Sequence, residues 1–95
     1  MDTNSLTGHY GCLNRHTLRL ALDREGIRHN AYSIGGEERP ESYCLGIVPG
    51  GWAVWYAERG HRNDLTVFDT EDEACSELLL KLINDPTTRP RPSNT

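Results

Sequence analysis

The sequence has no long hydrophobic run, and no apolar stretch approaches the roughly 20 residues that a membrane-spanning helix needs. Its first residues, MDTNSLTGHYGC, contain neither the basic start nor the apolar segment of a secretory signal. We therefore expect a cytoplasmic protein with no membrane partner.

Cysteine is scarce, and no two of the three cysteines form a C-x-x-C pair. We interpret Cys12, Cys44 and Cys75 as free thiols, two of them in the core. The four histidines fall in different segments, and Cys12 with His16 is a lone C-x-x-x-H spacing. A zinc site needs three or four converging ligands, so we predict neither a metal nor a cofactor.

Catalytic signatures are also missing. The sequence contains no P-loop, no dinucleotide fingerprint and no glycine-framed nucleophile. Cys44 and Cys75 fall at or near core positions, where a thiol is usually inert. Glu58 and Asp64 could flank a turn, but paired carboxylates are common on solvated turns. We predict that the protein is not an enzyme.

The net charge of −4 argues against a nucleic-acid partner. The element order expected below, α-β-β-β-α, is also that of double-stranded RNA-binding domains, whose second helix opens with lysines. Here that position reads TEDEACSE, which would repel phosphate. The basic turn of Arg59, His61 and Arg62 is the only feature favouring a nucleic acid.

Local signals predict one α+β domain over residues 13–85, after a flexible lead-in (1–12) and before a disordered proline-rich tail (86–95). Asn14 is a natural N-cap for a helix over residues 14–25, and Gly26 a natural stop. Thr70 with Glu73 forms the capping box of a second helix, which Pro86 ends.

Between the helices, residues 28–41 form a connector, and alternating apolar residues predict strands over 42–48, 52–58 and 64–69. We expect a three-stranded antiparallel meander with both helices on one face. Alternation assigns Leu45, Ile47, Val54 and Val67 to that face. Trp55 points to the other face, where it is either exposed or covered by the lead-in or the connector.

Carboxylates gather in two clusters, one in the connector and one around the start of the second helix: Glu37, Glu38, Glu41, Asp69, Glu71, Asp72, Glu73 and Glu77. Few basic residues lie nearby in the sequence. Such an unbalanced field speeds encounter with a basic partner.

The sequence over about residues 13–85 resembles small bacterial immunity proteins of polymorphic-toxin and contact-dependent inhibition systems, and three short motifs carry this resemblance. They are a tyrosine-glycine connector (Tyr32 with Gly35 and Gly36), a W-x-V-x-Y-x-E-R-G strand and turn (52–60), and an F-D-[ST]-E-x-E-A-C helix start (68–75). The resemblance implies an antidote that binds and blocks a cognate toxin domain, possibly a basic nuclease, without catalysis.

We assign Trp52, Val54, Tyr56 and Gly60 of the strand motif to the fold. The residues predicted to bind the toxin are Glu37, Glu38, Glu41, Tyr43, Trp55, Glu58, Arg59, Glu71, Asp72 and Glu77. A monomer is favoured. The alternative is a generic interaction module that self-associates through the free sheet face or an edge strand.

Overall fold

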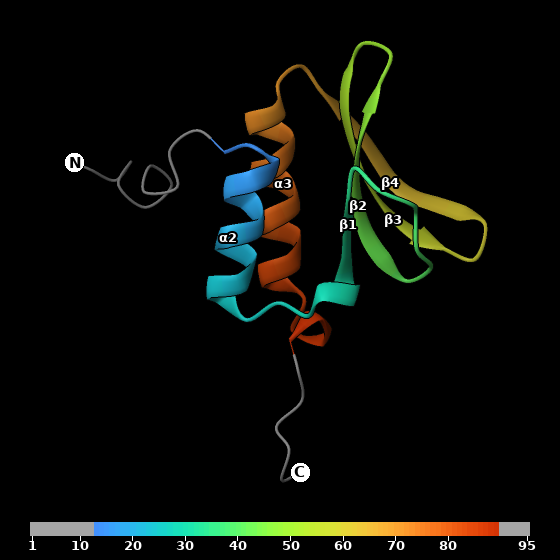
Figure 1. The fold of residues 1–95 in the computed structure, drawn as a ribbon. Coiled ribbons are helices and arrows are strands. Elements are labelled where there is room, and N and C mark those ends of the chain that lie inside the picture. The colour runs from blue at the N-terminus through green and yellow to red at the C-terminus, as the bar shows by residue number, and fades with distance from the viewer. Residues whose placement is uncertain (1–12, 90–95) are drawn as a thin grey trace, which may run out of the picture.

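The structure is a computed structural model that describes residues 13–89. Over this range the chain is α+β, with two α-helices on one side of a four-stranded sheet (Figure 1). The elements are α2 (Arg15–Glu25), η1 (His29–Ala31), β1 (Tyr32–Ile34), β2 (Ser42–Val48), β3 (Gly51–Glu58), β4 (His61–Phe68), α3 (Glu71–Asn84) and η2 (Pro86–Thr88). Neither described helix has the length and apolar character needed to cross a bilayer. The predicted lead-in, residues 1–12, lies outside the described residues, as do residues 90–95.

The sheet contains one strand more than the sequence predicts, and it is mixed rather than antiparallel throughout. Its order is β1-β2-β3-β4, with β1 parallel to β2 and the other pairs antiparallel. Parallel neighbours need a connection that returns along the sheet. Because β1 has only three residues, the short crossover segment formed by residues 35–41 is long enough to return.

Capping interactions fix both ends of α2 as predicted. Asn14 Oδ1 accepts a hydrogen bond from the Thr17 N–H at 2.9 Å, and Thr17 Oγ1 accepts one from the Asn14 N–H at 2.9 Å. At the other end, Gly26 has φ 77°, and the Ile27 N–H donates to the Leu22 carbonyl at 3.0 Å. These bonds satisfy backbone groups that the helix itself leaves unpaired.

Helix α3 begins after Thr70, whose hydroxyl accepts a hydrogen bond from the Glu73 N–H at 3.1 Å, which confirms the predicted N-cap. After α3 the chain does not start the expected tail but forms the 3₁₀ helix Pro86–Thr88. Thr88 is buried, and its hydroxyl is satisfied by donating a 2.7 Å hydrogen bond to the carbonyl of Leu82. The predicted disordered tail therefore does not include these residues.

The main core lies between the helices and the sheet. Its fully buried side chains include Leu18, Leu22, Leu45, Val54, Leu78 and Leu82. Two residues predicted for this core are not in it, since Ile47 is 67% exposed and Val67 is 50% exposed. Ile47 shares the face of Leu45 but lies near the β2–β3 turn, where that face is uncovered. Val67 pairs with Ala53, so it lies on the opposite face of the sheet from the helices.

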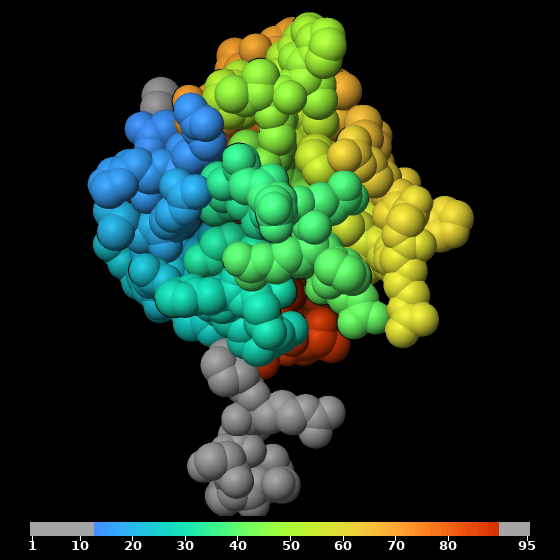
Figure 2. All heavy atoms as spheres, turned by 45° about the vertical axis from the view of Figure 1, so that its right-hand side comes forward, coloured from blue at the N-terminus to red at the C-terminus, as the bar shows by residue number. Residues whose placement is uncertain are grey.

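Trp55 faces away from the helices as predicted. The residue is only 7% exposed, so the first of the two alternatives for it, an exposed ring, is wrong. The alternative, that the 28–41 connector covers it, is confirmed. Trp55 Nε1 donates a 2.9 Å hydrogen bond to Glu38 in the crossover segment. Around the ring pack Cys44, Ala53 and Ala57. Figure 2 shows the connector, in teal and green, across the middle of this side of the molecule.

Candidate partner-binding site

A hollow of about 510 Å³ lies where strands β2, β3 and β4 meet the C-terminal end of α3. We call it the tyrosine hollow, and it is lined by Tyr43, Tyr56, Asn63, Asp64, Lys81, Asn84, Asp85 and Pro86. The strand register places Tyr43 opposite Tyr56 and Tyr56 opposite Asn63. Directly opposed residues share a face, so three adjacent strands each present a side chain to this hollow, and β4 adds Asp64 as a second.

Tyr43 and Tyr56 pack edge to face, with ring centroids 4.8 Å apart and planes at 60°. The Tyr43 hydroxyl donates a 2.8 Å hydrogen bond to Asp85 Oδ2. Burial, followed by this hydrogen bond and the charge of Asp85, raises the pKa of Tyr43 well above that of free tyrosine. Hydrogen bonds from Thr87 and then Tyr43 lower the pKa of Asp85. At neutral pH a neutral phenol therefore donates to an ionised carboxylate.

Carboxylates surround the partly exposed Tyr56. Burial is the largest cause that raises the pKa of Tyr56. The charges of Glu41, Glu58 and Asp85 raise it further, and the charge of Arg28 lowers it. Asp64 lines the hollow from β4, and its charge also raises the pKa of Tyr43. Lys81 is a cation in the wall, but its Nζ lies 3.4 Å from Glu77. The field at the tyrosine pair is therefore predominantly negative.

Two of these carboxylates sit on unusual backbone. Glu41 has φ 59° and Asp64 has φ 57°, and they are the non-glycine residues with positive φ in the described part of the chain. The Glu41 N–H is held by the Ala57 carbonyl. Asp64 lies where the register of β3 and β4 shifts, between Val54 and Tyr56 of β3. A bulge of this kind re-aims side chains, and such backbone is frequent at binding sites.

Of the predicted binding residues, Tyr43 lines the tyrosine hollow. Glu41 and Glu58 do not line it, and they act on it through the effect of their charges on Tyr56. Glu58 Oε1 accepts a 2.7 Å hydrogen bond from Asn63, which does line the hollow. The hollow also contains residues that the sequence analysis did not assign to binding: Tyr56, Asp64 and Asp85. The spacing of Glu58 and Asp64 across the turn was a usable signal for Asp64. No sequence signal pointed to Asp85, which precedes the helix-ending proline.

Two predicted binding residues at the start of α3 instead connect the two helices. Glu71 Oε2 accepts hydrogen bonds from Arg15 N at 2.9 Å and Arg15 Nε at 3.1 Å. Asp72 Oδ1 accepts one from the Leu13 N–H at 2.8 Å. Both carboxylates thus satisfy backbone donors at the N-terminal end of α2, where negative charge is also favoured by the helix dipole.

Glu38 and Trp55 also have internal partners. Arg62 Nη2 lies 3.0 Å from Glu38 Oε1, and the Arg62 guanidinium stacks 4.4 Å from the centre of the Trp55 ring. Hydrogen bonds from Arg62 and then from Trp55 lower the pKa of Glu38. This three-residue cluster, which we call the tryptophan clamp, fastens the crossover segment to the sheet.

The remaining predicted residues lie away from the tyrosine hollow. Glu77 is paired with Lys81 one turn along α3. Arg59 is exposed beside the β3–β4 turn, next to a second hollow that Glu38 also lines. Glu37 borders a further pocket between α2 and β1. The ten predicted residues therefore do not form one continuous site.

Within residues 13–89, no three histidine, cysteine or acidic side chains are grouped so that they could hold a metal ion. Burial, followed by the charges of Glu71 and Asp72, raises the pKa of Cys75 to about 12. A buried thiol that stays protonated is a poor nucleophile. The tyrosine hollow instead offers aromatic surface, hydrogen bonds and negative charge.

Comparison of this chain with family models, with curated proteins and with solved structures gives no significant match.

Proposed function

We propose that the chain is an immunity protein that binds a cognate bacterial toxin domain and neutralises it by occupancy, without turnover. The observation that carries the proposal is the tyrosine hollow, a concave polar site in which two packed aromatic rings are surrounded by carboxylates. In this proposal the hollow takes a lysine or arginine side chain from the toxin.

A basic side chain suits the hollow in two ways. Its cationic end is attracted to the face of an aromatic ring such as the partly exposed Tyr56. It can also form a charge-assisted hydrogen bond with the carboxylate of Asp64, which lines the hollow. A volume of about 510 Å³ leaves room for one long side chain. Buried anchors of this kind dominate the energy of many protein interfaces.

The charge of the whole chain supports a basic partner. The net charge is −4. A negative field around the site speeds encounter with a positively charged domain, while the pairing geometry sets how long the complex lasts. The three motifs of the connector, the β3 strand and the start of α3 favour an immunity protein over an unrelated acidic binding module.

The proposal is tested with the product of the gene directly upstream, purified and titrated with this chain by calorimetry at two salt concentrations. We expect binding in the nanomolar range that weakens as salt rises, and loss of the toxin's activity at one equivalent of the chain. Failure of that protein to bind would contradict the proposal.

One observation favours the second candidate, a module that self-associates. Strand β4 is an edge of the sheet, and its Leu65 and Val67 are 45% and 50% exposed. Exposed edges of this kind pair with other chains. The bulge at Asp64 works against such pairing. A sedimentation coefficient that rises with concentration in the wild type, and not in Val67→Lys, would support this candidate.

A further inference from the structure

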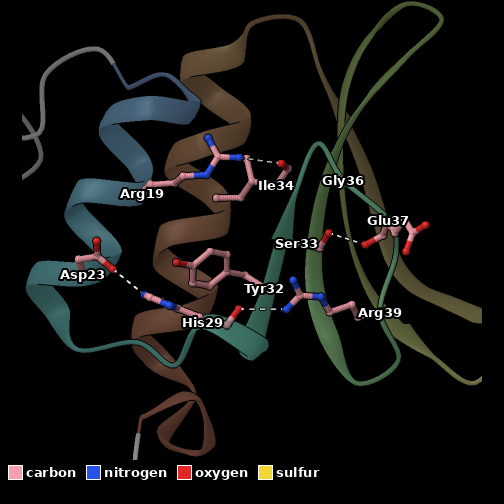
Figure 3. Close-up of a pocket in the computed structure, with 9 residues that line it drawn as sticks. All are labelled: Arg19, Asp23, His29, Tyr32, Ser33, Ile34, Gly36, Glu37 and Arg39. Atoms are coloured by element: carbon pink, nitrogen blue, oxygen red, sulfur yellow. Dashed lines mark hydrogen bonds and ion pairs between the residues drawn. The ribbon is translucent and has the colours of Figure 1, made fainter.

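A second pocket, of about 520 Å³, lies between α2, β1 and the crossover segment. We call it the arginine pocket, and the residues that matter for its chemistry are Arg19, Asp23, His29, Tyr32, Glu37 and Arg39. Figure 3 shows Arg19 and Asp23 reaching it from α2, and Arg39 approaching from the opposite wall. It is separate from the tyrosine hollow, with which it shares no lining residue.

Both arginines are held in place by backbone carbonyls. Arg19 Nη2 donates a 2.9 Å hydrogen bond to the Ile34 carbonyl, and Arg39 Nη1 donates a 3.4 Å hydrogen bond to the His29 carbonyl. Among the described residues, no carboxylate lies within ion-pair distance of either guanidinium. A carbonyl orients a guanidinium without neutralising its charge, and several N–H donors on each group remain available.

The acidic residues of the pocket offset only part of this charge. Asp23 Oδ1 lies 3.0 Å from His29 Nε2 and is engaged there. Glu37 is held through its backbone carbonyl, which accepts a 2.6 Å hydrogen bond from Ser33. Figure 3 shows the Glu37 carboxylate directed away from Arg19 and Tyr32. Two guanidinium groups against the one inward carboxylate leave an excess of one positive charge among these three groups.

Tyr32 lines the same pocket and supplies a further polar group. Its pKa is raised by burial and then by the charge of Asp23, while the charges of Arg19 and Arg39 oppose that rise. The hydroxyl keeps its proton at neutral pH and can donate it in a hydrogen bond. Figure 3 shows the ring between α2 and β1, below Arg19 and above His29.

We propose that the arginine pocket binds a carboxylate, which the Arg19 and Arg39 guanidinium groups and the Tyr32 hydroxyl hold together. A guanidinium matches the two oxygens of a carboxylate in geometry as well as in charge. One carboxylate also balances the single positive charge that the pocket retains. This proposal concerns the ligand chemistry of the pocket and does not depend on the toxin.

The carboxylate belongs either to a small acid or to an acidic side chain of a polypeptide. The test is an NMR titration of the full chain, labelled with nitrogen-15, with sodium acetate and with a capped Gly-Glu-Gly peptide, at constant ionic strength. Sodium chloride is the reference titration. We expect saturable shifts of the backbone amides of Ser33 and Gly36–Arg39 with a carboxylate, and none with chloride.

Variants of the pocket arginines test whether the carboxylate binds in the arginine pocket. Arg19→Gln and Arg39→Gln should each weaken carboxylate binding by about tenfold or more, since a hydrogen bond to a charged group is lost. Arg24→Gln is the matched control, because Arg24 is exposed on the same helix and does not line the pocket. Thermal melts of all three variants should stay close to that of the wild type.

Similar affinities for acetate and the peptide would identify a site for small acids, and tighter peptide binding would identify a site for an acidic side chain. Shifts that do not saturate, or that Arg24→Gln weakens as much as Arg19→Gln does, would overturn the proposal.

Discussion

The Tyr43 hydroxyl donates a 2.8 Å hydrogen bond to Asp85 Oδ2, which joins the second strand of the sheet to the residue that follows α3. The bond fixes one wall of the tyrosine hollow. It also couples the protonation of a tyrosine to folding, because burial and then Asp85 raise the pKa of Tyr43.

This coupling predicts loss of stability in alkali. A tyrosine whose pKa is raised on folding contributes stability that is fully present below its unfolded pKa, about 10, and is lost as pH rises towards the folded value. We expect the free energy of unfolding, measured with urea between pH 8 and 11, to fall more steeply in the wild type than in Tyr43→Phe. The raised pKa values of Tyr32, Tyr56 and Cys75 act in both proteins, so the difference isolates Tyr43. Parallel curves would contradict the coupling.

Two residues of β2 test where the core ends. Leu45 is 2% exposed and Ile47 is 67% exposed, although both lie on the same face of the strand. We expect Leu45→Ala to lower the free energy of unfolding by about 2–5 kcal/mol, since it leaves a cavity. Ile47→Ala, the matched control, should lower it by about 0.5 kcal/mol or less. Equal losses in urea unfolding would mean that the helices also cover the end of β2.

The tryptophan clamp predicts a fluorescence change. Glu38→Gln removes the charge that Arg62 contacts, and it weakens the hydrogen bond from Trp55 Nε1. We expect emission from Trp55 to move to longer wavelength, because water reaches the ring, and backbone amides of residues 35–41 to exchange faster. The measurement is made in a Trp52→Phe background, so that Trp55 is the only tryptophan that emits. Glu37→Gln, next to Glu38 but outside the clamp, should leave both observables unchanged. Faster exchange across the whole chain would indicate general destabilisation rather than opening of the clamp.

Much of the fold was predictable because its signals are local. Asn14 and Gly26 mark the ends of α2, and Thr70 marks the start of α3, through hydrogen bonds to residues within one turn. Strand β1 was missed because its three residues carry too little alternation to stand out and its parallel pairing with β2 depends on distant residues.

Coverage of the sheet was harder to predict than the direction of its side chains. Alternation places Ile47 on the face of Leu45 but does not say how far along the strand the helices extend. Val67 was assigned to the wrong face because cross-strand register is not encoded in the strand itself. The same alternation gave the correct direction for Trp55, while its cover comes from a crossover segment that carries no apolar pattern.

The candidate site was predictable only in part. Tyr43 lines the hollow, and the charges of Glu41 and Glu58 act on Tyr56. All three residues belong to acidic and aromatic stretches that stand out in the sequence. Asp64 and Asp85 join them only through a bulge in β4 and the end of α3, which are features of packing. Glu71 and Asp72 stand out equally in the sequence, yet they bind backbone donors of α2.

The most direct test of the central claim is the dissociation constant for the product of the upstream gene, measured for Asp64→Asn and for Asp69→Asn. Asparagine accepts the positive φ of residue 64, so the first variant removes a charge from the tyrosine hollow without disturbing the bulge. Asp69 is exposed and does not line the hollow, so the second variant is a control with the same change in net charge. We predict that Asp64→Asn raises the dissociation constant by about tenfold or more, the loss of one charged contact, whereas Asp69→Asn changes it by less than about twofold. Equal effects, or an unchanged constant for Asp64→Asn, would contradict the account.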